Sequence, residues 1–260
     1  MNLLRQVAAE LAATARRPRR LLELFRPASA RRVARRVLGA GRIDLMRAPW
    51  QDEAGSGLAR RRYRSYEQYV RHQRSKLDTL ELSAYQERFR AVLGERLLAA
   101  GLAGAGRNAL CLGARLGAEV QAFHDAGWFA VGIDLNPGPD NPYVLPGDFH
   151  HLVFPDGSVD AVYTNALDHA LEPERLLAEV RRVLAPGGLL VAEVAETGGS
   201  GEYEALSWSS LEDLVGFFAR CGFRELGRSP FDFPWGGGVQ LRLAPGASAA
   251  GGAGAGEAGA

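Results

Sequence analysis

Two glycines and one aspartate in the middle of the chain have the spacing of a nucleotide-binding turn. A short apolar run at 109–112 is followed by Gly113 and Gly117, and a second apolar run at 129–133 ends at Asp134. Short runs that are apolar on both faces are typical of strands buried in a parallel sheet. We therefore expect backbone N–H groups at the glycine turn to face a nucleotide, and the Asp134 carboxylate to accept from its ribose hydroxyls.

A second group of candidate residues could move a proton. Asp168 and His169 follow another apolar run at 161–164. Histidine is the usual general base near neutral pH, so we consider this pair catalytic. A histidine that opens a helix also has a purely structural explanation, and the sequence leaves both readings open.

Lys76 is the single lysine among the 31 lysine and arginine residues of the chain, and Gln73 lies one helical turn before it. A compact ammonium differs from a guanidinium in geometry and hydration. We therefore expect Lys76 to face the ligand, with an ordinary surface lysine as the alternative.

Alternating strand and helix patterns must position these residues. Strands are expected at 109–112, 129–133, 143–145, 161–164, 189–194, 224–227 and 239–243. Helices are expected at 65–77, 80–99 and 116–126, from Pro173 to 184, and from a cap at 207–210 to 219. The last two strands are joined by a short connection, which requires an antiparallel pair. Their loop is expected at the ligand edge, with Phe231, Phe233 and Trp235 near the substrate entrance.

The glycine turn differs from the dinucleotide fingerprint, since Gly113 and Gly117 are separated by three residues that include Arg115. It resembles the first motif of class I S-adenosylmethionine-dependent methyltransferases. The run RRVLAPGGLLVAEV resembles the late motif of the same superfamily. The resemblance covers about residues 80–243. Two departures are Ala114-Arg115 in the glycine region and Cys111 where the family often has an acid.

The resemblance implies an α/β Rossmann-like fold with a mostly parallel seven-stranded sheet, an antiparallel last strand, helices on both faces, and an N-terminal helical extension. It implies S-adenosylmethionine as cofactor and no metal. Together with Lys76 and with Asn165, which follows the strand at 161–164 on the carboxyl edge of the sheet, the predicted cofactor-binding residues are Gly113, Arg115, Gly117, Asp134, Leu135, Asp148 and Phe149. Arg115 would pair with the cofactor's carboxylate, and Asp148 and Phe149 would meet the adenine.

Charge is distributed unevenly along the chain, although the net charge is only +1. Residues 1–76 carry a net charge of +13 and residues 77–260 a net charge of −12. We expect a basic helical arm and linker at 1–62, with the linker at 48–57, a methyltransferase domain with N-terminal helices at 63–243, and a disordered Ala/Gly tail at 244–260. Residues 1–47 combine apolar helical spacing with arginine clusters, which is typical of a segment that lies on an anionic membrane. The alternative is that this arm binds the acidic remainder of the chain or a partner subunit.

Two classes of function follow from these patterns. The leading one is methyl transfer to a small-molecule or glycan- or lipid-linked acceptor. The alternative is a nucleic-acid or membrane-surface binding protein on a methyltransferase fold, which includes a nucleic-acid methyltransferase. Few aromatic residues interleave the arginines of the arm, which makes nucleic acid the weaker partner. With no signal peptide pattern and two cysteines expected to be reduced, we expect a cytoplasmic protein that is membrane-peripheral if the arm binds lipid.

Overall fold

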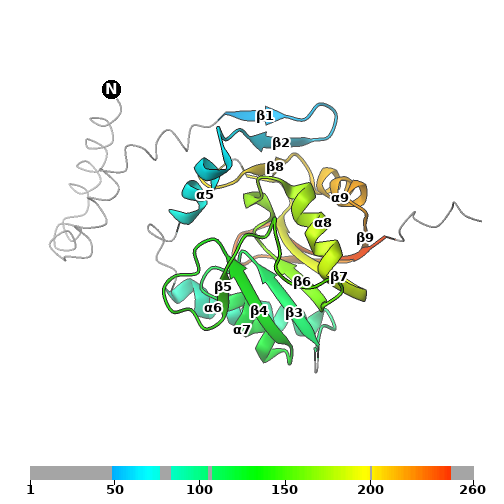
Figure 1. Cartoon of the computed structure of the whole chain (residues 1–260). Coiled ribbons are helices and arrows are strands. Elements are labelled where there is room, and N and C mark those ends of the chain that lie inside the picture. Colours follow the sequence, from blue (N-terminus) through cyan, green and yellow to red (C-terminus); the bar gives the residue numbers. More distant parts are fainter. Residues whose placement is uncertain (1–48, 77–82, 105–106, 200, 247–260) are drawn as a thin grey trace, which may run out of the picture. The chain divides into compact units, whose positions relative to one another are not determined.

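The computed structural model of the protein describes residues 49–76, 83–104, 107–199 and 201–246 (Figure 1). The chain divides into two compact units, Met1–Ala48 and Pro49–Ala260. Every described residue belongs to the second unit. The predicted arm at 1–47 lies outside the described residues, as does the predicted tail from residue 247 onward.

The elements in chain order are β1 (Trp50–Asp52), β2 (Leu58–Arg61), α5 (Tyr66–Arg74), α6 (Ser83–Ala99), β3 (Asn108–Leu112), α7 (Ala118–Asp125), β4 (Phe129–Asp134), β5 (Val144–Pro146), β6 (Val159–Thr164), the 3₁₀ turn η1 (Leu167–His169), α8 (Pro173–Val183), β7 (Leu184–Ala195), β8 (Leu206–Trp208), α9 (Leu211–Arg220), β9 (Phe223–Phe231) and β10 (Gly238–Pro245).

Seven strands form the main sheet in the order β5-β4-β3-β6-β7-β10-β9. Neighbouring strands from β5 to β7 pair in parallel, whereas β10 is antiparallel to both β7 and β9. β9 therefore runs parallel to β7, as the short connection to the last strand predicted. The predicted fold class is confirmed for the described part of the chain.

Helices cover both faces of this sheet (Figure 1). Side chains of α8 and α9 pack with Leu110 and Leu112 of β3 in one core cluster. Side chains of α6 and α7 pack with Ala109 and Cys111 of the same strand in another. Successive side chains of a strand point to opposite faces, so β3 is buried on both sides, which is why its sequence is apolar without alternation.

Local signals set the helix ends. The Ser65 and Ser210 hydroxyls each accept a hydrogen bond from the backbone N–H three residues later, so each satisfies a donor that α5 or α9 leaves unpaired. Pro173 occupies the first turn of α8, where no backbone N–H is needed. None of the helices in the described part of the chain is both long and apolar enough to cross a membrane.

A second, three-stranded sheet lies where the sequence predicted no strands. β2 pairs antiparallel with both β1 and β8, and Leu58 faces Trp208 in the register. Residues 49–57, predicted as part of a linker, instead contain β1 and the turn into β2. The prediction was wrong here because these strands are short and the pairing of β2 with β8 joins residues about 150 positions apart. β10 also extends to Pro245, into the segment predicted as tail.

Candidate active site

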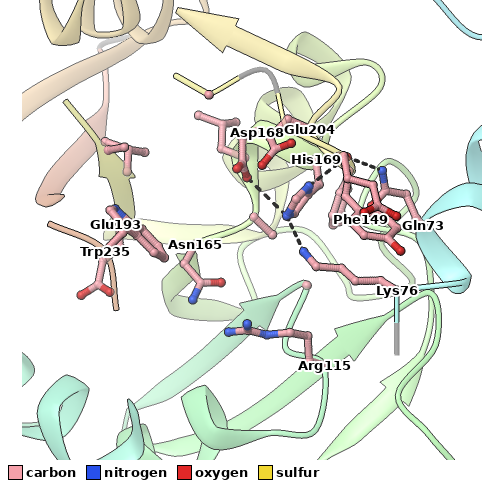
Figure 2. A pocket seen from close by; sticks show the side chains of 18 of the residues that line it. Gln73, Lys76, Arg115, Phe149, Asn165, Asp168, His169, Glu193, Glu204 and Trp235 are labelled. Atoms are coloured by element: carbon pink, nitrogen blue, oxygen red, sulfur yellow. Dashed lines mark hydrogen bonds and ion pairs between the residues drawn. The ribbon is translucent and has the colours of Figure 1, made fainter. Parts of the chain in front are cut away.

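A cavity of about 780 Å³ opens at the carboxyl ends of the parallel strands (Figure 2). Gly113 after β3, Asp134 at the end of β4, Asn165 after β6 and Ala195 at the end of β7 all line it. Ligands of open α/β sheets bind at this edge, where the strand order reverses. The sequence-predicted residues are thus brought to one place by the topology of the sheet.

The Asp134 carboxylate is held in a fixed orientation at the cavity wall. Its Oδ2 accepts a hydrogen bond from the Arg115 N–H at 2.9 Å, and its Oδ1 accepts from the Asn136 N–H at 2.8 Å. A carboxylate offers about four lone-pair positions. Two therefore remain for hydroxyl groups of a ligand.

The turn between β3 and α7 requires glycine at both predicted positions, for two different reasons. Gly113 has φ +69°, lines the cavity, and a Cβ there would lie 2.6 Å from the Ala166 Cβ. Gly117 has φ +95° and caps α7, and a Cβ there would lie 2.8 Å from the Tyr143 Cβ. Gly117 is outside the cavity lining, so its visible role is the close approach of the turn to Tyr143.

The two residues predicted to meet the adenine, Asp148 and Phe149, lie in different places. Phe149 lines the cavity, as does the predicted cofactor-binding residue Leu135, whereas Asp148 does not. The Asp148 carboxylate accepts hydrogen bonds from the Tyr66 hydroxyl and from His150 Nδ1, the latter at 2.8 Å. These local partners hold Asp148 against α5, which its sequence position beside Gly147 did not indicate.

Arg115 and Asn165 line the cavity, and both contact the buried carboxylate of Glu119. Arg115 Nη2 lies 2.5 Å from Glu119 Oε1, and Asn165 Nδ2 donates to the same oxygen at 3.4 Å. The Glu119 side chain is 1% exposed, so the ion pair balances the Arg115 charge within the protein. Contact between Arg115 and a ligand carboxylate stays a prediction. In such a contact the Arg115 guanidinium would bind both the ligand carboxylate and Glu119.

Lys76 and His169 meet inside the cavity, as Figure 2 shows. His169 Nδ1 lies 3.1 Å from the Tyr203 carbonyl oxygen, which can only accept, so Nδ1 carries the proton. His169 Nε2 then presents its lone pair to Lys76 Nζ at 2.6 Å. Burial and the Lys76 charge lower the pKa of His169 to about 3, and burial also lowers the pKa of Lys76.

Asp168 belongs to the same group, although it does not bond closely to His169. Its Oδ1 lies 3.7 Å from His169 Nε2. Burial raises the pKa of Asp168 to about 6, and the Lys76 charge opposes part of this rise. The structure thus brings the predicted catalytic pair and Lys76 into one cavity, while their catalytic roles stay predictions.

Asp168→Asn should stabilise the protein more at about pH 7.5 than at about pH 4.5. The folded-state pKa of Asp168 is about 6, above the ordinary 3.8, so ionisation opposes folding increasingly from about pH 4 to 6. A rise of about two units corresponds to at most ~3 kcal/mol. His169 titrates in the opposite sense, with its pKa lowered from 6.5 to about 3, but it is present in both proteins.

Thermal melts of the wild type and of Asp168→Asn measure this effect. The gain in Tm on substitution at about pH 7.5 is compared with the gain at about pH 4.5. An equal or smaller gain at the higher pH would contradict the burial of the Asp168 carboxylate.

The opposite wall of the cavity combines a buried acid with an indole ring (Figure 2). The fully buried Glu193 carboxylate accepts from Arg96 at 2.7 and 2.8 Å, from the Tyr163 hydroxyl at 2.9 Å and from Gln240 at 3.0 Å. Trp235 also lines this wall of the cavity. Among the three aromatic residues predicted at the entrance, Phe231 and Phe233 instead pack on the side chains of α6, against Arg96 and Arg88 respectively.

α5 and the β7–β8 connection supply lining residues that the sequence did not indicate, among them Tyr69, Tyr203 and Glu204. The Tyr69 hydroxyl donates to the His169 carbonyl oxygen at 3.0 Å, and Gln73 Nε2 donates to the Tyr203 carbonyl oxygen at 2.8 Å. These bonds fasten α5 onto the strand ends. The only signal in the sequence was the concentration of acids and aromatics in GEYEALSW, and it carried no information about which partner it would meet.

Residues 110–192 match the family described as methyltransferase domain. A demethylmenaquinone methyltransferase from Renibacterium salmoninarum is 35% identical over 96 residues, which covers 33% of this chain and 40% of that protein. A sterol 24-C-methyltransferase from Gibberella zeae is 52% identical over 46 residues, which covers 17% of this chain and 12% of that protein. The chain spans at most 40% of the length of these curated relatives.

Solved structures share the fold. A 1,6-didemethyltoxoflavin-N1-methyltransferase from Burkholderia thailandensis, with S-adenosylhomocysteine bound, superposes with a TM-score of 0.57 at 16% identity, over 76% of this chain and all of that one. A protein from Pyrococcus horikoshii superposes with a TM-score of 0.52 at 17% identity, over 70% of this chain and all of that one. Residues 110–192 thus match a methyltransferase domain, and the described part of the chain has the fold of these two structures.

The side chains of this methyltransferase domain fit the cofactor that the family uses. Asp134 keeps two lone-pair positions for ribose hydroxyls, and Phe149 offers an aromatic ring beside Leu135. At Gly113 the space that a Cβ would fill is closed by Ala166, so the backbone itself forms the cavity wall. These residues would hold the nucleoside half of S-adenosylmethionine.

Proposed function

We propose that this chain transfers a methyl group from S-adenosylmethionine to a small acceptor, either a free small molecule or a glycan- or lipid-linked intermediate. The observation that carries this proposal is the cavity at the carboxyl ends of β3, β4, β6 and β7, in a chain whose residues 110–192 match a methyltransferase domain. It is lined by the residues that would bind the nucleoside, and also by Lys76, His169 and Trp235.

The size and walls of the cavity favour a small acceptor. Its volume of about 780 Å³ lies in the range of small-molecule sites. Tyr69 of α5 and Tyr203 of the β7–β8 connection border it. The names of the two methyltransferases with sequence similarity, and of the B. thailandensis enzyme, refer to small organic acceptors, which supports the same class here.

S-adenosylmethionine supplies a methyl group that its sulfonium already activates. The residues of the chain then need only to bind both reactants, orient the nucleophile behind the methyl carbon and exclude water. Orientation alone contributes up to ~7–11 kcal/mol. A base adds ~10²–10⁴-fold where the nucleophile must lose a proton.

Two measurements on the full chain test the proposal. Titration calorimetry with S-adenosylhomocysteine should show binding in the micromolar range, near −8 kcal/mol. Incubation with methyl-labelled S-adenosylmethionine and fractionated metabolites should then yield a labelled small product. Absence of S-adenosylhomocysteine binding at millimolar concentration would reject the proposal, and label found only in nucleic acid or protein would reject a small acceptor.

Trp235→Ala should raise KM for the acceptor found in that screen and leave the affinity for S-adenosylhomocysteine unchanged. The indole lines the cavity on the wall opposite Lys76, and removal of a ring that packs on a ligand costs ~2–3 kcal/mol, or ~30- to 100-fold. Phe129→Ala is a matched control, because Phe129 is 68% exposed at the start of β4, the opposite end of the sheet. If KM is unchanged in Trp235→Ala, the ring serves packing alone.

A further inference from the structure

The contact between Lys76 and His169 decides which of the two can accept a proton in the cavity. His169 Nδ1–H donates to the Tyr203 carbonyl oxygen, so Nε2 is the only basic atom of the ring. That atom lies 2.6 Å from Lys76 Nζ. For His169 to act as the base, its lone pair must give up the hydrogen bond that it accepts from Lys76, which either an ammonium or a neutral amine can donate.

Lys76 does not face this obstacle. Its neutral amine can donate an N–H to His169 Nε2 and still use its own lone pair to accept a proton. Lys76 lies just after α5, in the cavity, with its amine pointing between His169 of η1 above and Arg115 below (Figure 2). Its position is held by the His169 Nε2 lone pair and by the ring of Tyr203, 5.7 Å away. The amine is therefore both oriented and inside the volume that an acceptor would enter.

Charged groups from each packed element act on this amine. Burial lowers the pKa of Lys76 most; Asp168 of η1 raises it, Arg115 after β3 lowers it, and Glu204 and Asp134 raise it. His169 stays neutral, since burial and Lys76 lower its own pKa to about 3. Among the described residues, the balance makes the ammonium of Lys76 easier to deprotonate than that of an exposed lysine.

We propose that Lys76, with His169 as its positioning residue, takes the proton of the acceptor, and that the acceptor presents a phenolic or enolic hydroxyl. This inference rests on the proposed methyl transfer and adds the class of acceptor and the identity of the base. Methyl transfer to a neutral hydroxyl is slow, so the hydroxyl must lose its proton before its oxygen attacks the methyl carbon.

The proposed step balances without another reactant. The acceptor O–H bond breaks and an N–H bond forms on Lys76 Nζ, so the electron pair stays on oxygen. The oxygen then forms a bond to the methyl carbon as the carbon–sulfur bond breaks, and that electron pair remains on sulfur. Lys76 leaves the cycle as an ammonium and returns its proton to solvent.

Acidity and shape select the acceptor class. Because burial lowers the pKa of Lys76, its amine takes a proton most readily from an acidic hydroxyl, such as that of a phenol with a pKa of about 10. The resulting oxyanion would be stabilised by the adjacent ammonium in a site with little water. The rings of Tyr203 and Trp235 line the same cavity and offer flat surfaces to an aromatic acceptor.

The first test uses Lys76 as the single lysine of the chain. The rate of its acetylation by acetic anhydride is followed against pH by mass spectrometry, with the α-amino group, of pKa about 7.7–8.0, as the internal reference. We expect half-maximal reactivity of Lys76 below the ~10.4 of an ordinary lysine, and slower reaction in the presence of 4-nitrophenol. Half-maximal reactivity at or above that value would overturn the proposal.

The second test uses 4-nitrophenol as a probe, because its phenol and phenolate forms have different absorption spectra. On the wild-type chain, with and without S-adenosylhomocysteine, the bound probe should have a phenolate-to-phenol ratio about tenfold above that of the free probe at the same pH, which is one unit of pKa. Lys76→Gln should lose this increase, and His169→Gln, whose amide oxygen can still accept from the lysine, should retain part of it.

Three results of the probe test would overturn the proposal: no binding of the probe to the wild-type chain, an unchanged ratio, or loss of the increase in His169→Gln but not in Lys76→Gln. If a variant does not fold, as judged by its thermal melt, the acetylation profile of the wild-type protein still decides. Calorimetry with S-adenosylhomocysteine reports separately on methyl transfer as the function, since neither test of Lys76 requires that ligand.

Discussion

Replacing Asp134 with alanine is expected to lower the affinity for S-adenosylhomocysteine by about 10- to 100-fold. The carboxylate would make charge-assisted hydrogen bonds to ribose hydroxyls, and their loss costs ~1.5–3 kcal/mol in total. The structure adds a second reason, because the same carboxylate accepts from the backbone N–H groups of Arg115 and Asn136 and so orders the turn. Calorimetry on the wild-type and variant chains measures the loss.

Two further variants separate these contributions. Asp134→Asn keeps one acceptor oxygen and removes the charge, so its affinity should lie between those of the wild type and Asp134→Ala. Asp156→Ala removes a carboxylate that is 80% exposed and lies just before β6, at the opposite end of the sheet, and it should bind like the wild type. Wild-type affinity in Asp134→Ala would show that Asp134 does not bind the ribose.

Arg96→Met is expected to give the largest loss of stability, about 3–5 kcal/mol. It removes the cation from a pair in which the Arg96 side chain is 13% exposed and the Glu193 side chain is not exposed at all. The change leaves a buried carboxylate without its counter-charge, which is the costly way to break such a pair. It also removes the donor to the Phe233 carbonyl oxygen, 2.8 Å away.

For a domain of about 200 residues this loss lowers Tm by roughly 6–20 °C. Arg90→Met is the matched control: Arg90 forms an equally short pair with Asp125, at 2.6 Å, but both side chains are more than 40% exposed. Surface pairs of this kind contribute ~0–1 kcal/mol. Equal melting temperatures of the two variants would mean that the Glu193 carboxylate is not desolvated in solution.

The two substitutions act at opposite ends of one cavity. Asp134 ends β4 on one side of the sheet centre, and Glu193 lies near the end of β7 on the other. The first is expected to change ligand affinity with a modest effect on stability, whereas the second is expected to change stability first. Comparison of calorimetry and melting for both variants would show how far binding and folding share the same residues.

The sequence by itself determined the strands of the main sheet, its antiparallel last pair and the edge at which the cavity lies. β3, β4 and β6 are short apolar runs, and the end of each is marked by a polar residue or glycine: Gly113, Asp134 and Asn165. These signals are local, because burial on both faces of a parallel strand leaves an unbroken apolar pattern. The carboxyl ends of such strands meet at one edge, so residues at those ends are brought together without further information.

Tertiary structure alone decided the small sheet and the side-chain partners. β1 and β2 have no periodic signal of their own. β2 pairs with β8, which lies about 150 residues later in the chain, and no local pattern encodes such a partner. The position of Asp148 in the sequence predicted contact with the adenine. In the structure its carboxylate accepts from the Tyr66 hydroxyl and from His150, and Asp148 does not line the cavity. The sequence predicted that Lys76 and His169 lie near one ligand. Only folding brought these side chains, 93 residues apart, to within 2.6 Å of each other, so that the His169 Nε2 lone pair accepts from Lys76.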